Sequence, residues 1–469
     1  MNTLIIVIIL SVLLNPIFIL IRQNYTNRIK DINKKLINID TTQDAVDTNK
    51  NTISFGYEYN TNKLVQISDK ELNQHALVIG TTGSGKTTTL LNIVEHGCKN
   101  ELPVIYIDGK GSLKLAEKIS KICMRHNRTL KVFSLDPNHL VPNLSHYNPF
   151  ASGNFTEWKN KITTLTQQSD NKGQEHYSLQ EEGYISILCE VLQQSYAKFN
   201  THIDLKEIIG YIKDRKKLEG LAPKIDPHLG MRLIMIHRAL KDVEQFDLVK
   251  ILESFYHSHY GHLFETSNIP QNQVIELEKS IKNKEVILFL LDAASYKKDT
   301  NMIGRLIIND INSVFASFGR NNTHHDGYCI FDEFASYASP NMASVLSMQR
   351  DNGLHAIVGT QSIHAISIEN QSVKRVAVEL IANCNTFFIH KINDSQDVDI
   401  LVKTIGTKTH PEIITTHNTK YGNTSYSVKN IDKPLIIPQD IRTLEPGVGY
   451  VCQTTQNIKP RKVRFNLID

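Results

Sequence analysis

Residues Gly80 to Thr87 read GTTGSGKT, and this octet matches the phosphate-loop pattern at every fixed position: glycine, four variable residues, glycine, lysine, then serine or threonine. Its three glycines allow a tight turn that points successive backbone N–H groups into one concavity. A short apolar run, residues 75–79, precedes the octet, and residues 86–98 have the apolar spacing of a helix. The sequence therefore predicts a strand, a phosphate-binding loop and a helix whose positive end faces the phosphates.

Two side chains of the octet have predicted roles in binding a nucleoside triphosphate. Lys86 is expected to contact the β- and γ-phosphates and to act in catalysis. Thr87 is expected to offer its hydroxyl to Mg²⁺, which takes most of its ligands from water and phosphate and few from protein. The predicted cofactors are therefore ATP and Mg²⁺. The other nucleotide-binding candidates lie in the same loop and the first helical turn: Gly80, Thr81, Thr82, Gly83, Ser84, Gly85 and Thr88.

The composition describes a folded protein of moderate charge. Of 469 residues, 41% are hydrophobic, so the chain can bury a substantial core, in roughly two to four structural units. Lys and Arg total 52 against 48 Asp and Glu. This balance permits a polyanionic partner such as DNA but does not by itself indicate one. The six cysteines include no CxxC pair and lie in or beside apolar runs, which predicts reduced, buried thiols and no zinc site.

The first residues predict attachment to a membrane. Residues 4–21 are almost all Leu, Ile, Val and Phe, about the shortest run that can cross a hydrocarbon core of roughly 30 Å. Basic residues follow this run and none precedes it, so the positive-inside rule predicts a single-pass anchor, residues 1–22, with the bulk of the chain cytoplasmic. A cleaved signal peptide is the alternative, although no small-residue cleavage site follows. Residues 23–52 are expected to form a juxtamembrane linker.

The remainder alternates strand-length apolar runs with helical patterns, which predicts an α/β fold with a mainly parallel sheet. Residues 53–59 and 64–67 are expected to pair as a hairpin before the phosphate loop. Helical spacing dominates residues 154–280, where we expect an all-helical domain inserted into a nucleotide-binding domain of residues 53–153 and 281–469. The predicted strands are residues 104–108, 130–136, 286–292, 328–332, 355–360, 386–391 and 449–453.

The run Tyr328 to Glu333, YCIFDE, is the predicted second half of the nucleotide site. A buried strand that ends in two acids can place Asp332 beside the metal and Glu333 next to the attacking water as the general base. The next strand leads into Gln361, whose uncharged amide is a candidate to sense the γ-phosphate or to hold the water. Arg350, at the end of an amphipathic helix, is a candidate to reach a neighbouring subunit's nucleotide; a surface salt bridge is the alternative.

With these motifs the chain, from about residue 63 to its end, resembles the type IV coupling proteins, the TraG/TraD group of membrane-anchored ATPases that feed DNA to conjugative secretion channels. Besides the phosphate loop, the resemblance rests on the order of DGKG at 108–111, YNPF at 147–150, DEF at 332–334, Arg350 with Gly353, GTQS at 359–362 and NCNT at 383–386.

This resemblance implies a RecA-like motor domain, an all-helical domain facing the cytoplasm and a homo-hexameric ring. It also implies ATP-driven movement of single-stranded DNA, with a bound relaxase, towards the inner components of a type IV secretion channel. Arg350 looks like the family's arginine finger and Gln361 like its sensor glutamine, while Asp108 and Lys110 match a motif with a supporting role near the nucleotide.

Two departures from the family pattern bear on partners. Many members have two membrane helices with an external domain between them, whereas this chain offers one predicted span, which leaves lateral contacts of that helix as the alternative route to the channel. A long acidic carboxy-terminal tail of the kind some members use for cargo is also missing. The sequence has instead the basic run 459–464, expected either to touch nucleic acid or to form an exposed edge strand.

Other functions stay open. A septal-type double-stranded DNA translocase would share the motor, an effector-exporting coupling ATPase would not bind DNA, and a docking subunit would bind nucleotide without turnover. Lys297 and Lys298 are candidates for DNA contacts in a lumen loop, with an ordinary surface loop as the alternative. The basic run at 213–217 could meet DNA or a partner, or form a solvated helix face.

Overall fold

The computed structural model of the chain describes residues 51–136, 144–166, 179–239, 247–339, 341–368, 371–418, 423–454 and 458–468. The predicted anchor, residues 1–22, and all but the last two residues of the predicted linker lie outside this part. Among helices in the described ranges, none combines the length and apolar character that crossing a membrane requires.

Eleven of the described strands form one sheet, in the order β2-β1-β15-β14-β11-β3-β10-β9-β4-β8-β5. All neighbours from β11 to β5 are parallel, and β14, β15, β1 and β2 extend the sheet antiparallel. The predicted hairpin of β1 with β2 is therefore present. The strands are β1 Thr52–Glu58, β2 Leu64–Ser68, β3 Ala76–Ile79, β4 Val104–Asp108, β5 Leu130–Ser134, β8 Val286–Leu290, β9 Gly327–Asp332, β10 Leu354–Thr360, β11 Thr386–Ile389, β14 Val448–Gln453 and β15 Arg461–Phe465.

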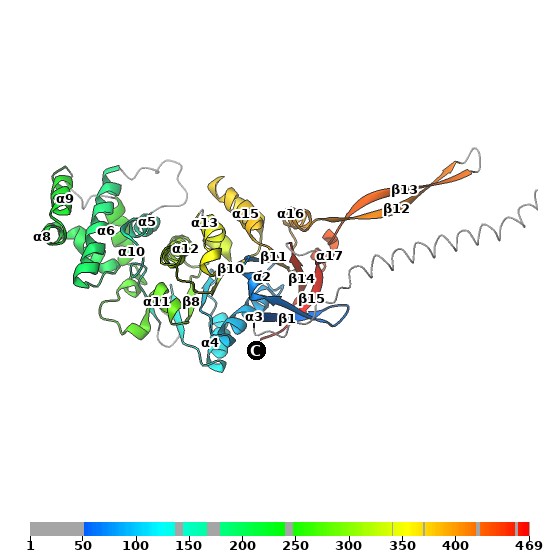
Figure 1. The fold of residues 1–469 in the computed structure, drawn as a ribbon, viewed down its shortest axis with the longest axis horizontal. Coiled ribbons are helices and arrows are strands. Elements are labelled where there is room, and N and C mark those ends of the chain that lie inside the picture. Colours follow the sequence, from blue (N-terminus) through cyan, green and yellow to red (C-terminus); the bar gives the residue numbers. More distant parts are fainter. Residues whose placement is uncertain are drawn as a thin grey trace, which may run out of the picture. The chain divides into compact units, whose positions relative to one another are not determined.

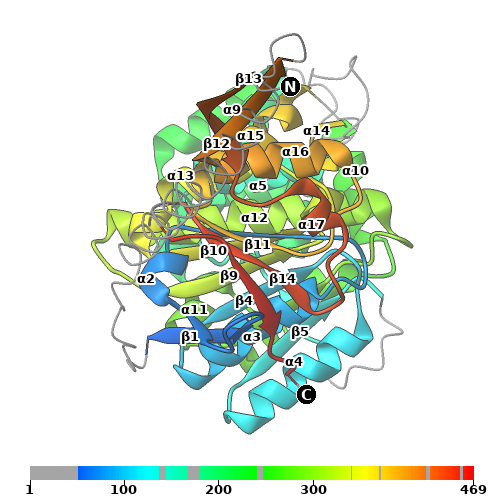
Figure 2. The ribbon, with the colours of Figure 1, turned by 90° about the vertical axis from the view of Figure 1, so that its right-hand side faces the viewer.

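Helices cover both faces of this sheet, with α3 and α4 on one side and α12 and α13 on the other (Figure 2). The alternation of side chains along β3 explains the two cores, because Ala76 and Val78 pack with α3 whereas Leu77 and Ile79 face the opposite cluster. The predicted α/β architecture with a mainly parallel sheet is confirmed. The helices of this part are α2 Asp69–Leu72, α3 Lys86–Lys99, α4 Leu113–Arg125, α12 Lys297–Arg320, α13 Asn341–Met348, α14 Ile363–Ile368 and α15 Gln371–Asn383, with short 3₁₀ turns η4 Phe334–Ser336 and η5 Arg350–Asn352.

The segment predicted to be all-helical consists of helices in its described residues, apart from two 3₁₀ turns and the two-residue strand β7, which pairs with β6. It packs on the sheet through one continuous hydrophobic core that includes Trp158, Leu188 and Phe315. Its elements and the strand before it are β6 His146–Tyr147, α5 Phe155–Thr166, α6 Leu179–Phe199, α7 Leu205–Lys213, α8 Arg215–Ile225, α9 Pro227–Ala239, α10 Asp247–Tyr256, η2 Gly261–Phe264, η3 Gln271–Gln273, β7 Val274–Ile275 and α11 Leu277–Lys282.

A long antiparallel arm, which the sequence analysis did not predict, follows β11. Strands β12, Thr407–Asn418, and β13, Asn423–Pro434, pair along their whole length and extend away from the sheet (Figure 1). The arm stands between helices α16, Ser395–Ile405, and α17, Pro438–Arg442. Since the N–H of Leu435 donates to the carbonyl of Gly406 at 3.1 Å, the chain enters and leaves the arm at one point.

The expected local structure of two basic runs is wrong, while no contact of either run with nucleic acid is tested. The run at 459–464 is no edge strand, because β15 lies between β1 and β14 and pairs with both. Lys297 and Lys298 do not lie in a loop but open helix α12, whose first turn is closed by the N–H of Thr300 donating to the carbonyl of Tyr296 at 2.7 Å.

Two other features outside the site bear on the sequence predictions, the basic run at 213–217 and the cysteines. In the basic run, Lys213 pairs with Glu253 at 2.6 Å and Lys217 with Glu207 at 3.4 Å, which favours a solvated helix face over a nucleic-acid surface. All six cysteines are free and buried, as predicted.

Candidate nucleotide site

The octet forms a loop between β3 and α3, as predicted. Gly83 and Gly85 have φ values of 79° and 115°, in the left-handed region that residues with a Cβ atom rarely adopt. Helix α3 begins at Lys86, so the first N–H groups of this helix have no carbonyl partner inside it and point into the loop. The Lys86 ammonium donates to the carbonyl of Gly80 at 2.7 Å and to that of Thr81 at 3.4 Å.

The loop is held from behind by strands on both sides of β3. Its first residues are fixed by two backbone bonds, from the N–H of Gly80 to Thr360 O at 3.3 Å and from the N–H of Thr81 to Lys391 O at 2.8 Å. A third bond joins the N–H of Gly447 to Ser84 O at 2.9 Å. The loop is therefore tied to the ends of β10 and β11 and to the residue before β14.

A buried histidine, which the sequence analysis did not assign, supports the same loop. His390 follows β11, and its Nε2 lies 2.9 Å from the hydroxyl of Thr89 in the first turns of α3. A Cβ atom at Gly80 would come within 2.6 Å of His390 Cβ, so glycine is needed where the loop passes this side chain. Burial lowers the pKa of His390 to about 3, and the nearby Lys86 charge acts in the same direction, so the imidazole is neutral.

Asp332 is the last residue of β9, which lies between β4 and β10. It therefore lies at the carboxyl-terminal ends of the parallel strands, where the phosphate loop also lies. One carboxylate oxygen accepts the hydroxyl of Tyr106 at 2.8 Å, and the other accepts the N–H of Glu333 at 2.9 Å. Burial raises the pKa of Asp332 to about 6, and the neighbouring acids Asp108 and Glu333 add to the shift. The carboxyl is thus rigidly placed and lies where a cation would be stabilised.

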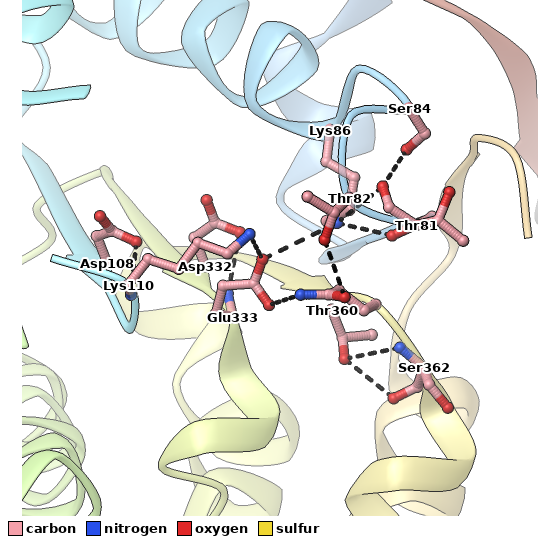
Figure 3. A network of polar contacts seen from close by, with 12 residues as sticks. Thr81, Thr82, Ser84, Lys86, Asp108, Lys110, Asp332, Glu333, Thr360 and Ser362 are labelled. Atoms are coloured by element: carbon pink, nitrogen blue, oxygen red, sulfur yellow. Dashed lines mark hydrogen bonds and ion pairs between the residues drawn. The ribbon is translucent and has the colours of Figure 1, made fainter. Parts of the chain in front are cut away.

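Glu333 is held in an unusual backbone conformation, with φ 52° and ψ 42°. Left-handed conformations of residues other than glycine store strain and occur preferentially at functional sites. Its carboxylate lies 4.0 Å from the Lys86 ammonium, forms an ion pair with Lys110, and accepts the amide N–H of Gln361 at 2.8 Å (Figure 3). The predicted lysine and the predicted base, about 250 positions apart in the sequence, therefore lie beside each other in one site.

Gln361 connects the two halves of the site. Its amide donates to Glu333, and its carbonyl oxygen accepts the hydroxyl of Thr82 at 3.1 Å. Because Thr82 belongs to the phosphate loop, any rearrangement of that loop on binding a ligand would be transmitted to Glu333 through one side chain. This position agrees with a role in sensing the γ-phosphate.

The electrostatics suit a site for a polyanion. Lys86 is 6% exposed, and burial lowers its pKa, while the charges of Glu333 and Asp332 raise it. A buried ammonium bonded mainly to carbonyl oxygens gains from an anionic ligand, which would restore the interactions that desolvation removed.

The residues also fit Mg²⁺. Thr87 is the second residue of α3 and Asp332 the acid of the adjacent strand edge. In the described part of the chain no group of three or more His, Cys, Asp or Glu residues could hold a metal ion on its own. Magnesium bound with a nucleotide does not need such a group, since phosphates and water supply most of its ligands.

Arg350 is the one predicted catalytic residue that lies away from this cluster of side chains. It is exposed, opens the turn η5, and precedes β10, whereas Gln361 and its contact with Glu333 lie beyond the carboxyl end of the same strand. The seven residues of β10 separate these two ends of the strand by roughly 20 Å. Arg350 therefore cannot complete the site of its own chain.

Two family models match parts of the chain. A family model described as "TraM recognition site of TraD and TraG" matches residues 327–446, and one described as "Helicase HerA, central domain" matches residues 53–226.

Two sequence relatives were found. The "Type 4 coupling protein DotL" of Legionella pneumophila is 22% identical over 412 residues, which cover 75% of this chain and 52% of DotL. The chain thus spans about half the length of that relative. An uncharacterized protein of Mycoplasma pneumoniae is 30% identical over 98 residues, covering 17% of this chain and 79% of that protein.

Solved structures share the fold. The plasmid coupling protein TrwB in complex with ADP and Mg²⁺ aligns with a TM-score of 0.55 at 14% identity, over 86% of this chain and 88% of TrwB. A trigonal form of TrwB with sulphate aligns with a TM-score of 0.56 at 14% identity, over 85% of both chains.

Proposed function

The chain belongs to the type IV coupling proteins, and we propose that it is a membrane-anchored ATPase that couples ATP hydrolysis to transport of single-stranded DNA, with its bound relaxase, into a type IV secretion channel. The observation that carries the ATPase function is the convergence of Lys86 and Gln361 on the Glu333 carboxylate. The TrwB structures with ADP and Mg²⁺ and with an ATP analogue, which share this fold, support ATP and Mg²⁺ as the cofactors.

The phosphate loop binds and orients the nucleotide. Backbone N–H groups of Thr82, Gly83 and Gly85 and of the first turn of α3, up to Thr88, would provide the cradle, while those of Gly80 and Thr81 hold the loop on the neighbouring strands. The positive end of that helix favours the phosphate charge. Lys86 would exchange its bonds to loop carbonyls for the β- and γ-phosphates. The Thr87 hydroxyl and the Asp332 carboxylate would hold Mg²⁺, which offsets charge on the phosphates.

Glu333 is the group placed to take the proton of an attacking water. It is nearly buried and fixed by its backbone conformation, and the Gln361 amide orients its carboxylate. Positioned general bases contribute typically about 10²- to 10⁴-fold to a rate. The same amide also bonds Thr82, so the geometry of the base depends on the state of the loop.

A second copy of the chain would complete the site. Arg350 is exposed and lies at the amino-terminal end of β10, away from the nucleotide site of its own chain. It is therefore available to a neighbour's nucleotide in a ring. Arginine fingers supplied in this way raise the rate by about 10³- to 10⁵-fold in the GTPases where they have been measured. We propose a homo-hexamer with Lys86, Thr87, Asp332 and Glu333 from one subunit and Arg350 from the next.

The proposed location follows from residues outside the described part. The apolar run at 4–21 would anchor the chain by a single span, with residues 53–469 in the cytoplasm. DNA would be gripped through its backbone rather than its base edges, which predicts little sequence preference and a strong dependence on salt.

The test is the rate of phosphate release by the full-length chain in mild detergent, with and without single-stranded DNA. Stimulation by single-stranded DNA supports the proposal. A response to double-stranded DNA alone would favour the septal-type translocase, and stimulation only by a protein cargo would favour the effector exporter. Nucleotide binding with no turnover under any condition would reduce the chain to a docking subunit and refute the ATPase.

A further inference from the structure

Lys110 contacts the carboxylate of Glu333, the proposed general base. Its ammonium forms an ion pair with Oε1 of Glu333, the same oxygen that lies 4.0 Å from the Lys86 ammonium. The other oxygen accepts the Gln361 amide at 2.8 Å. In this arrangement both oxygens of the base are engaged by side chains, and two cations share one of them (Figure 3).

The loop that carries Lys110 is built to approach Glu333. Asp108, 1% exposed, ends β4 and accepts the N–H of Lys110 at 3.0 Å and that of Ser112 at 2.7 Å. The N–H of Gly109 donates to Asp332 O at 3.2 Å. A Cβ atom at residue 109 would lie 3.1 Å from Glu333 Cβ, tighter than most such contacts, so glycine allows this close approach.

Of the two partners, the lysine is the one that can leave. The side chain of Lys110 is 48% exposed on a long stem, whereas that of Glu333 is 9% exposed. Ion pairs with an exposed partner contribute little net free energy. The Lys110 ammonium can therefore exchange the Glu333 carboxylate for an anion of higher charge. Lys86 is already bonded to the phosphate loop, which leaves Lys110 as the cation without a second acceptor among the contacts described for the pocket.

We propose that Lys110 is a latch on Glu333, closed when the γ-phosphate position is empty and opened when ATP is bound. This inference rests on the proposed ATPase function and deepens it. The Lys110 ammonium moves from the Glu333 carboxylate to the γ-phosphoryl oxygens, and the freed carboxylate oxygen then accepts the proton of the attacking water. ADP offers no γ-phosphoryl group, so it leaves the latch closed. Lys110 is thus a positioning residue for Glu333 and a second charge directed at the γ-phosphate.

The first test compares two fluorescent nucleotides, mant-ADP and non-hydrolysable mant-AMPPNP, on the full-length chain. A hydrogen bond to a charged group contributes about 1.5–3 kcal/mol, so we expect Lys110→Ala to weaken mant-AMPPNP binding by about tenfold or more. Binding of mant-ADP should change by less than about twofold. Lys110→Arg should retain the preference for the triphosphate, and Lys114→Ala, at an exposed position on α4, is the matched control.

The second test is a double-mutant cycle with Glu333→Gln. Removing the carboxylate charge frees Lys110, so Glu333→Gln should bind mant-AMPPNP more tightly than the wild type does. That gain should disappear in Lys110→Ala/Glu333→Gln, because the two side chains interact directly.

The outcomes separate this inference from the proposed function. If the wild type bound neither nucleotide, the ATPase proposal itself would fail. If the wild type bound both and Lys110→Ala left the ratio of the two affinities unchanged, or weakened both equally, the latch alone would be refuted. Additive effects of Lys110→Ala and Glu333→Gln on the affinity for mant-AMPPNP would refute it as well.

Discussion

Glu333 is the residue on which the proposed chemistry depends. Gln at this position keeps the size and the contact with Gln361 but cannot accept a proton. We predict that Glu333→Gln lowers the turnover number by about 10²- to 10⁴-fold, while nucleotide binding is retained. Lys86→Ala should instead abolish binding or hydrolysis, since the phosphates lose their buried cation. Phosphate release and mant-nucleotide titration measured on the same preparations check both; normal turnover in Glu333→Gln would rule out this side chain as the base.

His75, just before β3, makes the stability of the chain depend on pH. Its Nε2 lies 2.8 Å from Leu346 O and its Nδ1 accepts the N–H of Ala356 at 3.1 Å, a pattern that requires the neutral imidazole. Burial lowers its pKa from 6.5 to about 4, and the charges of His355 and Arg350 act in the same direction.

The sign of this effect follows from the unfolded chain, which binds the proton more readily than the folded one. The contribution of His75 is complete above pH 6.5 and is lost as the pH falls towards 4, up to about 3 kcal/mol in the free energy of unfolding. Urea unfolding of the wild type and His75→Gln between these pH values should show a shallower dependence in the variant. His228→Gln, at an exposed position, is the control; equal slopes in all three proteins would contradict the assignment.

At the residue scale the sequence predicted the chemistry better than the contacts. The octet and the acid pair follow from local patterns, so Lys86, Asp332 and Glu333 could be assigned before the fold was known. The position of Lys110 on Glu333 and of His390 behind the loop depends on strands distant in the sequence coming together, and no local pattern encodes that. The only sequence signal for Lys110 was its motif DGKG, and for His390 there was none.

At the scale of elements, α5 and α12 are joined by a buried ion pair. The ammonium of Lys161 lies 2.7 Å from the carboxylate of Asp310, both side chains are 1% exposed, and the hydroxyl of Tyr147 donates to the same carboxylate at 2.7 Å. The pair holds the helical segment against the sheet domain.

Removing one partner of a buried pair leaves the other charge uncompensated. We predict that Lys161→Met lowers the free energy of unfolding by about 3–5 kcal/mol, whereas Lys159→Met on the same helix changes it little. Lys161→Met/Asp310→Asn, which removes both charges, should recover part of the loss. Denaturant unfolding curves measure these effects, and a loss below about 1 kcal/mol for Lys161→Met would mean that the pair does not hold the helices together.

The elements that the sequence predicted are those with a strong local period. Strands β4, β9 and β10 are continuous apolar runs because both of their faces are covered. The arm of β12 and β13 was missed because polar residues and Pro411 interrupt its pattern and neither strand has a third partner in the sheets described. The place of β15 between β1 and β14 was missed for a different reason, since pairing between distant segments is not visible in either segment alone.

At the scale of the whole molecule, the two parts of the proposed shared site lie at opposite ends of the strands of one sheet. At the carboxyl-terminal ends of the strands lie the phosphate loop, Asp332 and Glu333, and Arg350 lies at their amino-terminal ends. A closed ring built from repeated head-to-tail contacts can bring Arg350 of one subunit to the nucleotide site of the next. In the proposed ring, no single copy of the chain can complete an active site.

The most direct test is phosphate release by full-length chains co-expressed as a mixture of Arg350→Ala and Glu333→Gln. Each variant alone should be nearly inactive, because every site lacks either the finger or the base. In the mixture about one interface in four combines an intact Glu333 with an intact Arg350 from its neighbour, so turnover should return to about a quarter of the wild-type rate. A mixture no more active than the two variants measured separately would contradict the shared site.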